Sequence, residues 1–308
     1  MHPMSPALKL KVFLITLIVF MSVSPTVTVS AEKGQMELME VITGNEMMGR
    51  FNQPTSIFFD ETKKRFYISD AGADRLLSFD NEFFYIAEFK QEGLELPVGV
   101  VKNKRGQFFV VSGSKAAITF IDVKEKVIKT LVFSGVPEKK EGVIPGRIAI
   151  DNNDRLYVTD RLNKRIIVLD STGVFVREIT VENEESYGFT DVRVDERGNL
   201  YALDTIARTV YVFNREGEMV SRFGSREIFD FPTSLAVDSK GLIYVVDQHQ
   251  GNVKVFDMKG SLLSELFEKG RKERELLSPS YIFIDKKDRF YIIDRGNNRV
   301  QIFIEEGK

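Results

Sequence analysis

The sequence predicts an all-β fold: a six-bladed β-propeller made of four-stranded blades. Three observations predict it. A motif recurs six times with a spacing of 43 to 48 residues, and each period contains four short β-type runs separated by polar turns. Beyond the N-terminal segment, no stretch shows sustained helical periodicity. A period in the forties with four strands in each repeat is typical of modules arranged around an axis.

The first 31 residues have the layout of a secretory signal. Two lysines precede an apolar run at 12–23, and Val-Ser-Ala at 29–31 supplies small residues before a cleavage point. The apolar run is shorter than the roughly 20 residues that a membrane-spanning helix needs. We therefore expect residues 1–31 to be a signal peptide and residues 32–308 to be an exported domain, periplasmic or extracellular. The alternative is an uncleaved anchor in the inner membrane.

Composition excludes several classes of function. The chain has 308 residues, of which 43% are hydrophobic and 29% charged, and its formal charge is −2. Removal of residues 1–31, which contain two Lys and no acidic residue, changes that charge to −4. No strong positive field would then attract nucleic acid or an anionic membrane. The chain has no Cys, which excludes disulfides and thiolate catalysis and suits a bacterial envelope or cell exterior.

The repeat is defined by two polar anchors, one after the first strand and one at the end of the second. Five full copies read IFFDETKKRFYISD, IAIDNNDRLYVTD, VRVDERGNLYALD, LAVDSKGLIYVVD and IFIDKKDRFYIID. A degenerate copy, VVKNKRGQFFVVS, has Asn103 and Ser112 at the two anchor positions. The first anchors fall at positions 60, 103, 151, 195, 238 and 285.

The third module shows how each blade is expected to form. Its first strand begins at Pro145, a polar turn follows at 151–154, and the second strand covers 156–159. A loop leads to the third strand at 165–169, and another turn leads to the fourth at 174–180. Short β-branched and aromatic runs bounded by Asp, Asn and Gly are typical of hairpins. The six blades are expected near residues 51–90, 96–133, 144–180, 187–224, 229–267 and 276–308.

The two ends of the repeat array indicate how the ring closes. The sixth module stops after its third strand at 300–304, whereas MELMEVIT at 36–43 is a strand without a module of its own. The sequence after this strand is similar to the exits of the other blades. Pairing of the two segments would complete the sixth blade and leave no module edge unpaired.

The repeats resemble those of the NHL-repeat family, whose module reads P-x-G-I-A-V-D-x-x-G-N-I-Y-V-A-D-x-x-N-x-R-I-x-V-F-D-x-x-G. The copies FPTSLAVDSKGLIYVVDQHQGNVKVFDMKG and SPSYIFIDKKDRFYIIDRGNNRVQIF carry the resemblance, which covers about residues 36–308. It implies a six-bladed propeller, and with the predicted signal and the lack of Cys the chain would be an exported bacterial member of the family. The family includes RNA-binding and protein-binding domains, and related propellers include amidating lyases, gluconolactonase-like hydrolases and strictosidine-synthase-like enzymes. The fold alone therefore does not choose a function.

Five acids recur at the end of the second strand. Arg75, Arg165 and Arg299 follow five residues after three of them and are placed to pair with an Asp of their own or a neighbouring blade. An Asp at a strand end can also accept hydrogen bonds from the next turn. Because catalysis needs one constellation rather than five copies, we interpret these acids as structural. They are Asp70, Asp160, Asp204, Asp247 and Asp294.

The family resemblance implies that ligands bind on the face formed by the second-to-third-strand loops and the blade-to-blade loops. Arg147, Asp191 and Tyr281 stand out near the start of the first strands, and the hairpin loops add further polar side chains. Together they would form a mixed, somewhat basic rim; the alternative is an ordinary solvated surface. The candidate set for a ligand or partner is Arg147, Arg161, Asp191, Gln248, His249, Tyr281 and Arg295.

The sequence contains no complete catalytic set. His249 is the one histidine outside the predicted signal, so the multi-histidine zinc site of amidating lyases cannot be built. A GxSxG elbow and a phosphate-binding glycine loop are absent. RNA binding would need clustered positive charge, whereas Lys and Arg are spread over the turns. We expect no cofactor and no metal, although the resemblance to gluconolactonase-like propellers leaves an oxygen-coordinated calcium site open.

These observations favour an exported, non-catalytic binding or scaffold propeller. It would recognise an envelope or extracellular protein, or a small ligand, through one face of the ring, as a monomer and without nucleic acid. The alternative is a calcium-dependent lactonase- or lyase-like hydrolase with Asp191 and Tyr281 at the channel mouth. The two differ in geometry, because calcium needs several oxygen ligands within about 2.3–2.6 Å of a common point.

Overall fold

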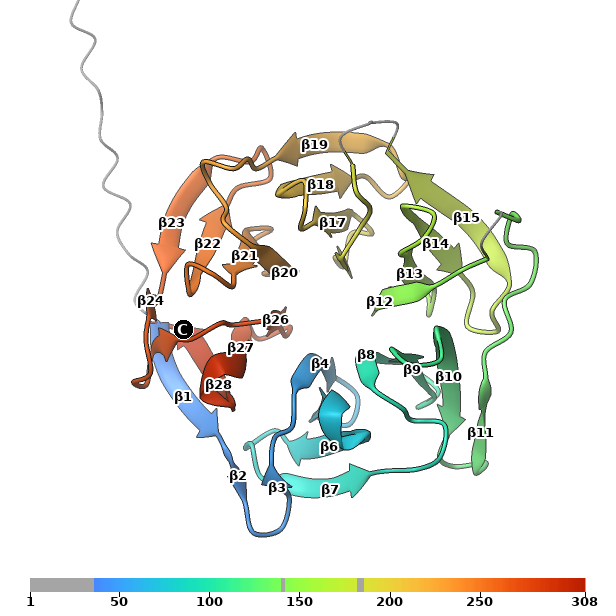
Figure 1. Cartoon of the computed structure of the whole chain (residues 1–308), viewed down its shortest axis with the longest axis horizontal. Helices are drawn as coiled ribbons and strands as arrows, with labels where there is room; N and C mark the ends of the chain where they lie inside the picture. Colours follow the sequence, from blue (N-terminus) through green and yellow to red (C-terminus); the bar gives the residue numbers. More distant parts are fainter. Residues whose placement is uncertain (1–35, 140–141, 182–185, 308) are drawn as a thin grey trace, which may run out of the picture. The chain divides into compact units, whose positions relative to one another are not determined.

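The computed structural model describes residues 36–139, 142–181 and 186–307; the predicted signal at 1–31 lies outside the described residues. The described chain forms six antiparallel four-stranded sheets arranged as a ring (Figure 1). This confirms the predicted all-β, six-bladed propeller. Two short strand pairs, β2–β3 (Gly44–Asn45 and Gly49–Arg50) and β24–β25 (Glu268–Lys269 and Glu275–Leu276), lie in the blade-to-blade connections.

In blades 1 to 5 the strands follow one another outward from the ring axis in chain order, and in blade 6 β1 takes the outermost position (Figure 1). Blade 1 consists of β4 (Pro54–Asp60), β5 (Arg65–Asp70), β6 (Arg75–Asp80) and β7 (Tyr85–Phe89). Blade 2 consists of β8 (Pro97–Lys102), β9 (Phe108–Ser112), β10 (Ala117–Asp122) and β11 (Val127–Thr130). Blade 3 consists of β12 (Pro145–Ile150), β13 (Leu156–Asp160), β14 (Arg165–Leu169) and β15 (Phe175–Thr180).

The second half of the ring repeats the pattern. Blade 4 consists of β16 (Asp191–Val194), β17 (Leu200–Asp204), β18 (Thr209–Phe213) and β19 (Met219–Phe223). Blade 5 consists of β20 (Pro232–Val237), β21 (Ile243–Asp247), β22 (Asn252–Phe256) and β23 (Leu262–Leu266). Blade 6 consists of β26 (Tyr281–Ile284), β27 (Arg289–Asp294), β28 (Arg299–Glu305) and β1 (Met36–Ile42). Two one-turn 3₁₀ helices, η1 (Ala71–Ala73) and η2 (Arg295–Asn297), lie in the second-to-third-strand loops of blades 1 and 6.

The N-terminal strand closes the ring, as the sequence predicts. β1 pairs antiparallel with β28, in a register that runs from Met36 opposite Glu305 to Ile42 opposite Val300. A bulge between Leu38 and Glu40 interrupts the ladder. The last blade is therefore built from both ends of the described chain, which ties the first blade to the sixth.

Hydrophobic packing lies between the blades. Because each sheet is covered on both faces by its neighbours, the second and third strands are buried along almost their whole length, and they read as continuous apolar runs rather than alternating ones. In β13 and β14 every residue is buried. The described residues form six hydrophobic clusters, each joining two adjacent blades around the ring.

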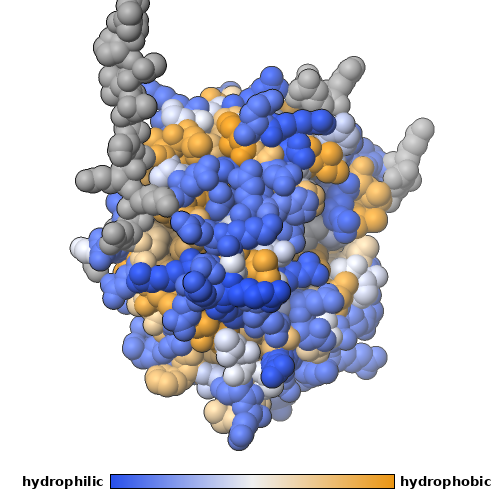
Figure 2. Space-filling view, turned by 60° about the vertical axis from the view of Figure 1, so that its left-hand side comes forward, coloured by the Kyte–Doolittle hydropathy of each residue, from blue (hydrophilic) through white to orange (hydrophobic). Residues whose placement is uncertain are grey.

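The outermost strands are the most exposed parts of the blades. All four residues of β11 are exposed, and Leu262 and Leu263 of β23 are 44% and 39% exposed. On the side of the ring shown in Figure 2, such hydrophobic residues lie in small groups between hydrophilic ones. Among the described residues, no helix has the length and apolar character to cross a bilayer.

Candidate functional site

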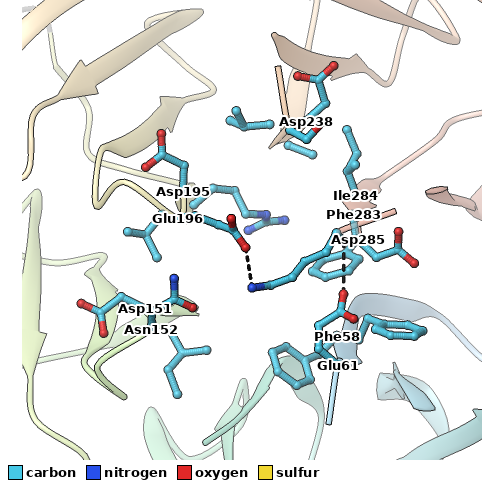
Figure 3. Close-up of a pocket in the computed structure, with 18 of the residues that line it drawn as sticks. Phe58, Glu61, Asp151, Asn152, Asp195, Glu196, Asp238, Phe283, Ile284 and Asp285 are labelled. Carbon is cyan, nitrogen blue, oxygen red and sulfur yellow. Dashed lines mark hydrogen bonds and ion pairs between the residues drawn. The ribbon is translucent and has the colours of Figure 1, made fainter. Parts of the chain in front are cut away.

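The first anchor of each repeat caps the turn between the first and second strands. Asp195 illustrates the geometry: one carboxylate oxygen accepts from the backbone N–H groups of Arg197 (2.9 Å) and Asn199 (2.8 Å). Its other oxygen accepts from the Tyr201 hydroxyl (3.1 Å). Figure 3 shows the carboxylates of Asp151, Asp195, Asp238 and Asp285 pointing away from the centre of the ring. This ring of acids therefore holds the turns and does not present free oxygens to a ligand.

The tyrosines that donate to these anchors are strongly affected by burial. Desolvation raises the pKa of Tyr157, Tyr201, Tyr244 and Tyr291 above its usual range, and the negative charge of the anchor Asp adds to the effect. Each phenol therefore stays protonated and remains a hydrogen-bond donor at physiological pH.

These turns surround a cavity, here called the turn-face cavity, with a volume of about 780 Å³. All six blades contribute to its wall, each through the anchor and the residues just before and after it. The residues just before the anchors are Phe59, Lys102, Ile150, Val194, Val237 and Ile284. The residues just after the anchors are Glu61, Lys104, Asn152, Glu196, Ser239 and Lys286. Because the innermost strands lie closest to the axis, the turns at their ends place one such side chain from each of the six blades around the cavity.

Charged side chains meet at the mouth of this cavity. Lys286, in the turn of blade 6, forms an ion pair through its ammonium group with Glu196 of blade 4, and blade 5 lies between them in chain order. The backbone N–H of Lys286 donates to Glu61 of blade 1 (3.1 Å). Figure 3 shows Glu196 and Glu61 on different sides of the hollow, each joined by a dashed line to the residue between them.

The inner end of the cavity is formed by Arg193 and two phenylalanines. The Arg193 guanidinium donates to Asp191 (2.8 Å) and to the carbonyl oxygens of Val192 (2.6 Å) and Ile282 (3.2 Å), while its buried Nε–H has no partner among the described residues. Phe58 and Phe283 lie beside it with their ring centroids 6.5 Å apart.

Behind Arg193, the channel is filled by a stack of side chains, here called the central stack. The Tyr281 ring lies between two guanidinium groups, with Arg193 Cζ 4.7 Å and Arg147 Cζ 5.0 Å from its centroid. Arg147 also donates to the carbonyl oxygens of Thr55 (2.8 Å) and Val98. Burial raises the pKa of Tyr281, which is 5% exposed. The space that the ribbons leave at the ring axis in Figure 1 is therefore occupied at this depth.

The structure thus places three of the candidate residues, Arg147, Asp191 and Tyr281, in one group, but it buries Asp191 and Tyr281 and half-buries Arg147 in the channel instead of exposing them on a rim. Asp191 is 0% exposed. It accepts four hydrogen bonds, from the backbone N–H groups of Val192 and Leu235, from Arg193 and from the Ser234 hydroxyl.

The other four candidates lie on the opposite face from the turn-face cavity, in second-to-third-strand loops. Arg161 belongs to blade 3, and its stem lies against Gly146, where an added Cβ would come within 2.9 Å of Arg161 Cγ. Gln248 and His249 belong to blade 5, and the His249 ring stacks on Phe231 at 4.7 Å. Arg295 is exposed in η2 of blade 6. Among the described residues, these four side chains are not joined to each other or to the central stack by any hydrogen bond, ion pair or ring contact.

The acids that end the second strands hold the blade-to-blade segments. Asp160 accepts from the backbone N–H of Ile144 (3.3 Å) and pairs with Arg165 (2.9 Å), and Asp70 likewise pairs with Arg75 of its own blade (2.8 Å). All five acids are 0% exposed. The backbone N–H groups they accept from, just ahead of each first strand, belong to Asn52, Ile144, Tyr187, Asp230 and Leu277. In the degenerate copy, the Ser112 hydroxyl instead donates to the Glu95 carbonyl oxygen (2.8 Å).

The calcium site that the alternative function needs does not fit the residues at the channel. Asp191 is the one acid at the start of a first strand, and both its oxygens are already engaged by four donors. Across the described parts of the chain, no group of three or more His, Cys, Asp or Glu side chains is arranged to hold a metal ion.

Comparison with known proteins places the chain among propellers. No protein-family model matches the sequence, and the search of curated proteins finds no match. An auxiliary nutrient-binding protein from Bacteroides ovatus is 16% identical, with a TM-score of 0.64, over 88% of this chain and 73% of that chain. The propeller domain of Cps50 (Swd1) from Myceliophteria thermophila is 12% identical, with a TM-score of 0.63, over 87% of this chain and 99% of that one.

A third similar structure is an enzyme. It is a catalytically inactive histidine-to-alanine variant of virginiamycin B lyase from Staphylococcus aureus with quinupristin, 12% identical, with a TM-score of 0.62, over 83% of each chain. At these identities the likenesses concern the fold alone, since propellers serve unrelated functions.

Proposed function

We propose that this chain is an exported, non-catalytic binding propeller of the NHL-repeat class that holds a small ligand in the turn-face cavity. The observation that carries the proposal is the cavity itself, which all six blades line and whose inner end is formed by Arg193 backed by the central stack. Its volume of about 780 Å³ lies within the range of small-molecule sites, roughly 300–1,000 Å³.

The lining favours binding over catalysis. The anchor carboxylates are engaged in turns, and neither histidine nor cysteine belongs to the lining residues. The Ser239 hydroxyl donates to Asp288 (2.6 Å), and no histidine or lysine accepts from it among the described residues. The histidine variant of the lyase is inactive, whereas His249 of this chain lies outside the cavity and stacks on Phe231. The nutrient-binding protein from Bacteroides ovatus offers a precedent for binding on this fold.

A thermal-shift screen of a diverse small-molecule panel tests this function. Asn152→Trp places a bulky ring at the cavity mouth, and Arg295→Trp is the matched control, because both parent side chains are exposed but lie on opposite faces. A ligand at about 100 times its Kd stabilises the folded state by about 2.7 kcal/mol. We expect stabilising compounds whose effect is lost in Asn152→Trp and kept in Arg295→Trp.

The reverse pattern would place the site on the face formed by the second-to-third-strand loops. Stabilisation kept by Asn152→Trp but lost in an Arg161/Arg295 double-alanine variant would show that the loops expected from the sequence bind the ligand. It would also show that the turn-face cavity does not.

A further inference from the structure

The ion pair at the cavity mouth is the most exchangeable contact of the site. The Glu196 and Lys286 side chains are 66% and 54% exposed. An exposed pair of this kind contributes little stability, so a ligand that offers each partner a new counter-charge can displace it at little cost.

Two other charged side chains near the mouth hold turns together, while Arg197, which also lines the cavity, is exposed in the turn of blade 4 next to Glu196. Glu61 accepts from the Lys286 backbone and, through its second oxygen, from the Lys64 ammonium (2.9 Å). Lys104 donates through its ammonium to the Asn152 carbonyl oxygen (2.6 Å), and its backbone N–H donates to Asp154 (3.1 Å). Glu196 and Lys286 already meet across the mouth from different blades, so they are the pair of opposite sign best placed to receive a ligand together.

Below this pair the wall is largely apolar, apart from Arg193 and from Lys102, whose ammonium pairs with Asp60. Phe58 and Phe283 lie tilted at 54° to one another beside Arg193. Aliphatic side chains from other blades continue the wall, and all remain partly exposed although they lie near the ring axis: Ile150, Val194, Val237 and Ile284. Covering such surface contributes roughly 25 cal/mol per Å² of apolar area removed from water. A ligand that fills this part of the cavity needs an apolar body.

Resting on the proposed function, we propose that the turn-face cavity takes a dipolar ligand that carries an ammonium and a carboxylate close together on an apolar body, the class of the free apolar amino acids. Such a ligand replaces one ion pair with two, ammonium to Glu196 and carboxylate to Lys286. A purely anionic ligand leaves Glu196 without its partner, and a purely cationic one leaves Lys286 without its partner. The mouth therefore selects for both charges at once.

Calorimetric titration with three compounds that share one body tests this selection. L-phenylalanine carries both charges, N-acetyl-L-phenylalanine only the carboxylate, and L-phenylalaninamide only the ammonium. With the wild-type protein, we expect phenylalanine to bind at least about tenfold more tightly than either derivative, a difference of about 1.4 kcal/mol.

Two charge-removing variants give the sharper result. Glu196→Gln leaves Lys286 unpaired and is expected to reverse the preference toward N-acetyl-L-phenylalanine, whereas Lys286→Met is expected to reverse it toward L-phenylalaninamide. Lys240→Met is the matched control, since Lys240 is 51% exposed, pairs with Glu305 (2.8 Å) and does not line the cavity. This control should keep the wild-type order.

Failure of this ligand class can be separated from failure of the site. Equal binding of the three compounds, no binding of phenylalanine, or unchanged preferences in the two variants would overturn the dipolar ligand class. If panel compounds still lose their effect in Asn152→Trp, the cavity remains the site and takes another class. If no compound depends on the cavity, the proposed function falls as well.

Discussion

Tyr281 is expected to stabilise the ring through the two faces of its aromatic ring rather than through its hydroxyl. Guanidinium carbons lie 5.0 Å and 4.7 Å from its centroid on the Arg147 and Arg193 sides. The hydroxyl makes a long hydrogen bond, 3.4 Å, to the Ile57 carbonyl oxygen. Replacing the ring should therefore cost more than removing the oxygen.

The magnitudes follow from this geometry. A cation–π contact stabilises by about 0.5–1 kcal/mol when exposed and by about 2 kcal/mol when desolvated, and the buried Tyr281 makes two such contacts with half-buried arginines. Tyr281→Leu keeps much of the apolar volume but loses both, so we expect the free energy of unfolding to fall by about 1–4 kcal/mol. Tyr281→Phe keeps the ring and loses only the long hydrogen bond, for which we expect a decrease of about 0.5–1 kcal/mol.

Urea unfolding followed by far-UV circular dichroism measures these differences. A double-mutant cycle of Tyr281→Leu with Arg147→Met, which keeps the apolar stem of the arginine, should give a coupling of about 1–2 kcal/mol. The same cycle with Arg161→Met is the control, because Arg161 makes no ring contact with Tyr281 among the described residues. Its coupling free energy should be less than about 0.5 kcal/mol. Coupling with Arg147 as small as the control, or a Phe variant as unstable as the Leu variant, would refute the reasoning.

Three further predictions concern the fold. Deleting residues 36–43 removes the strand that pairs with β28, so we expect less cooperative unfolding and a larger radius of gyration by X-ray scattering. Adding the missing peptide in trans should restore both. An unchanged unfolding midpoint would contradict ring closure by this strand. Asp160→Asn breaks the buried pair with Arg165 and should cost about 3–5 kcal/mol in urea unfolding. Arg161→Ala, on the same loop, should stay within about 0.5 kcal/mol, and equal losses would show that the buried pair has no special role. At alkaline pH, the anchor-bound tyrosines should destabilise the fold, because unfolded phenols ionise near pH 10.0 while the folded ones, with raised pKa, stay protonated. The stability that these protonated phenols contribute is fully present below about pH 10 and is lost as pH rises, by about 1.4 kcal/mol per pH unit for each tyrosine. The melting temperature of Tyr244→Phe should therefore fall less steeply with pH than that of the wild type.

The fold could be predicted from the sequence because the same physical requirement recurs in every blade. Each turn after a first strand needs an acceptor for its backbone N–H groups, so Asp151 has counterparts in the other copies. Each blade-to-blade segment needs an acceptor as well, so Asp160 has counterparts at a fixed spacing from the first set. Each buried strand between them needs an apolar run. The closing strand could be predicted for a related reason, since the array lacks one strand at one end and has a spare one at the other. These requirements are local, and they therefore appear in the sequence as a pattern that repeats with every blade.

The site could be predicted only in part. Arg147, Asp191 and Tyr281 are distinctive because they differ between copies, and the structure does bring them together, but one sequence does not show that they pack against each other and fill the channel. Arg193 was missed although it is the one charged residue two positions before an anchor. The other copies have apolar residues there, Phe58, Val101, Ala149, Ala236 and Phe283, and this contrast is the signal that could have found it. The useful signal was the position just after each anchor, which carries Glu61, Lys104, Asn152, Glu196, Ser239 and Lys286 in the six copies.

This pattern explains why the two faces of the ring differ in what they can bind. The second-to-third-strand loops, which carry Arg161 and His249, start one strand farther from the axis than the ends of the innermost strands (Figure 1). Side chains there belong to separate blades and face solvent separately. At the start of the innermost strands, the axis is occupied by Tyr281 and its two guanidinium partners. At the other end of those strands, variable side chains from all six blades surround an open volume, so a ligand there could contact several blades at once. A change of ligand then needs substitutions next to the anchors, while the anchors themselves continue to hold the turns.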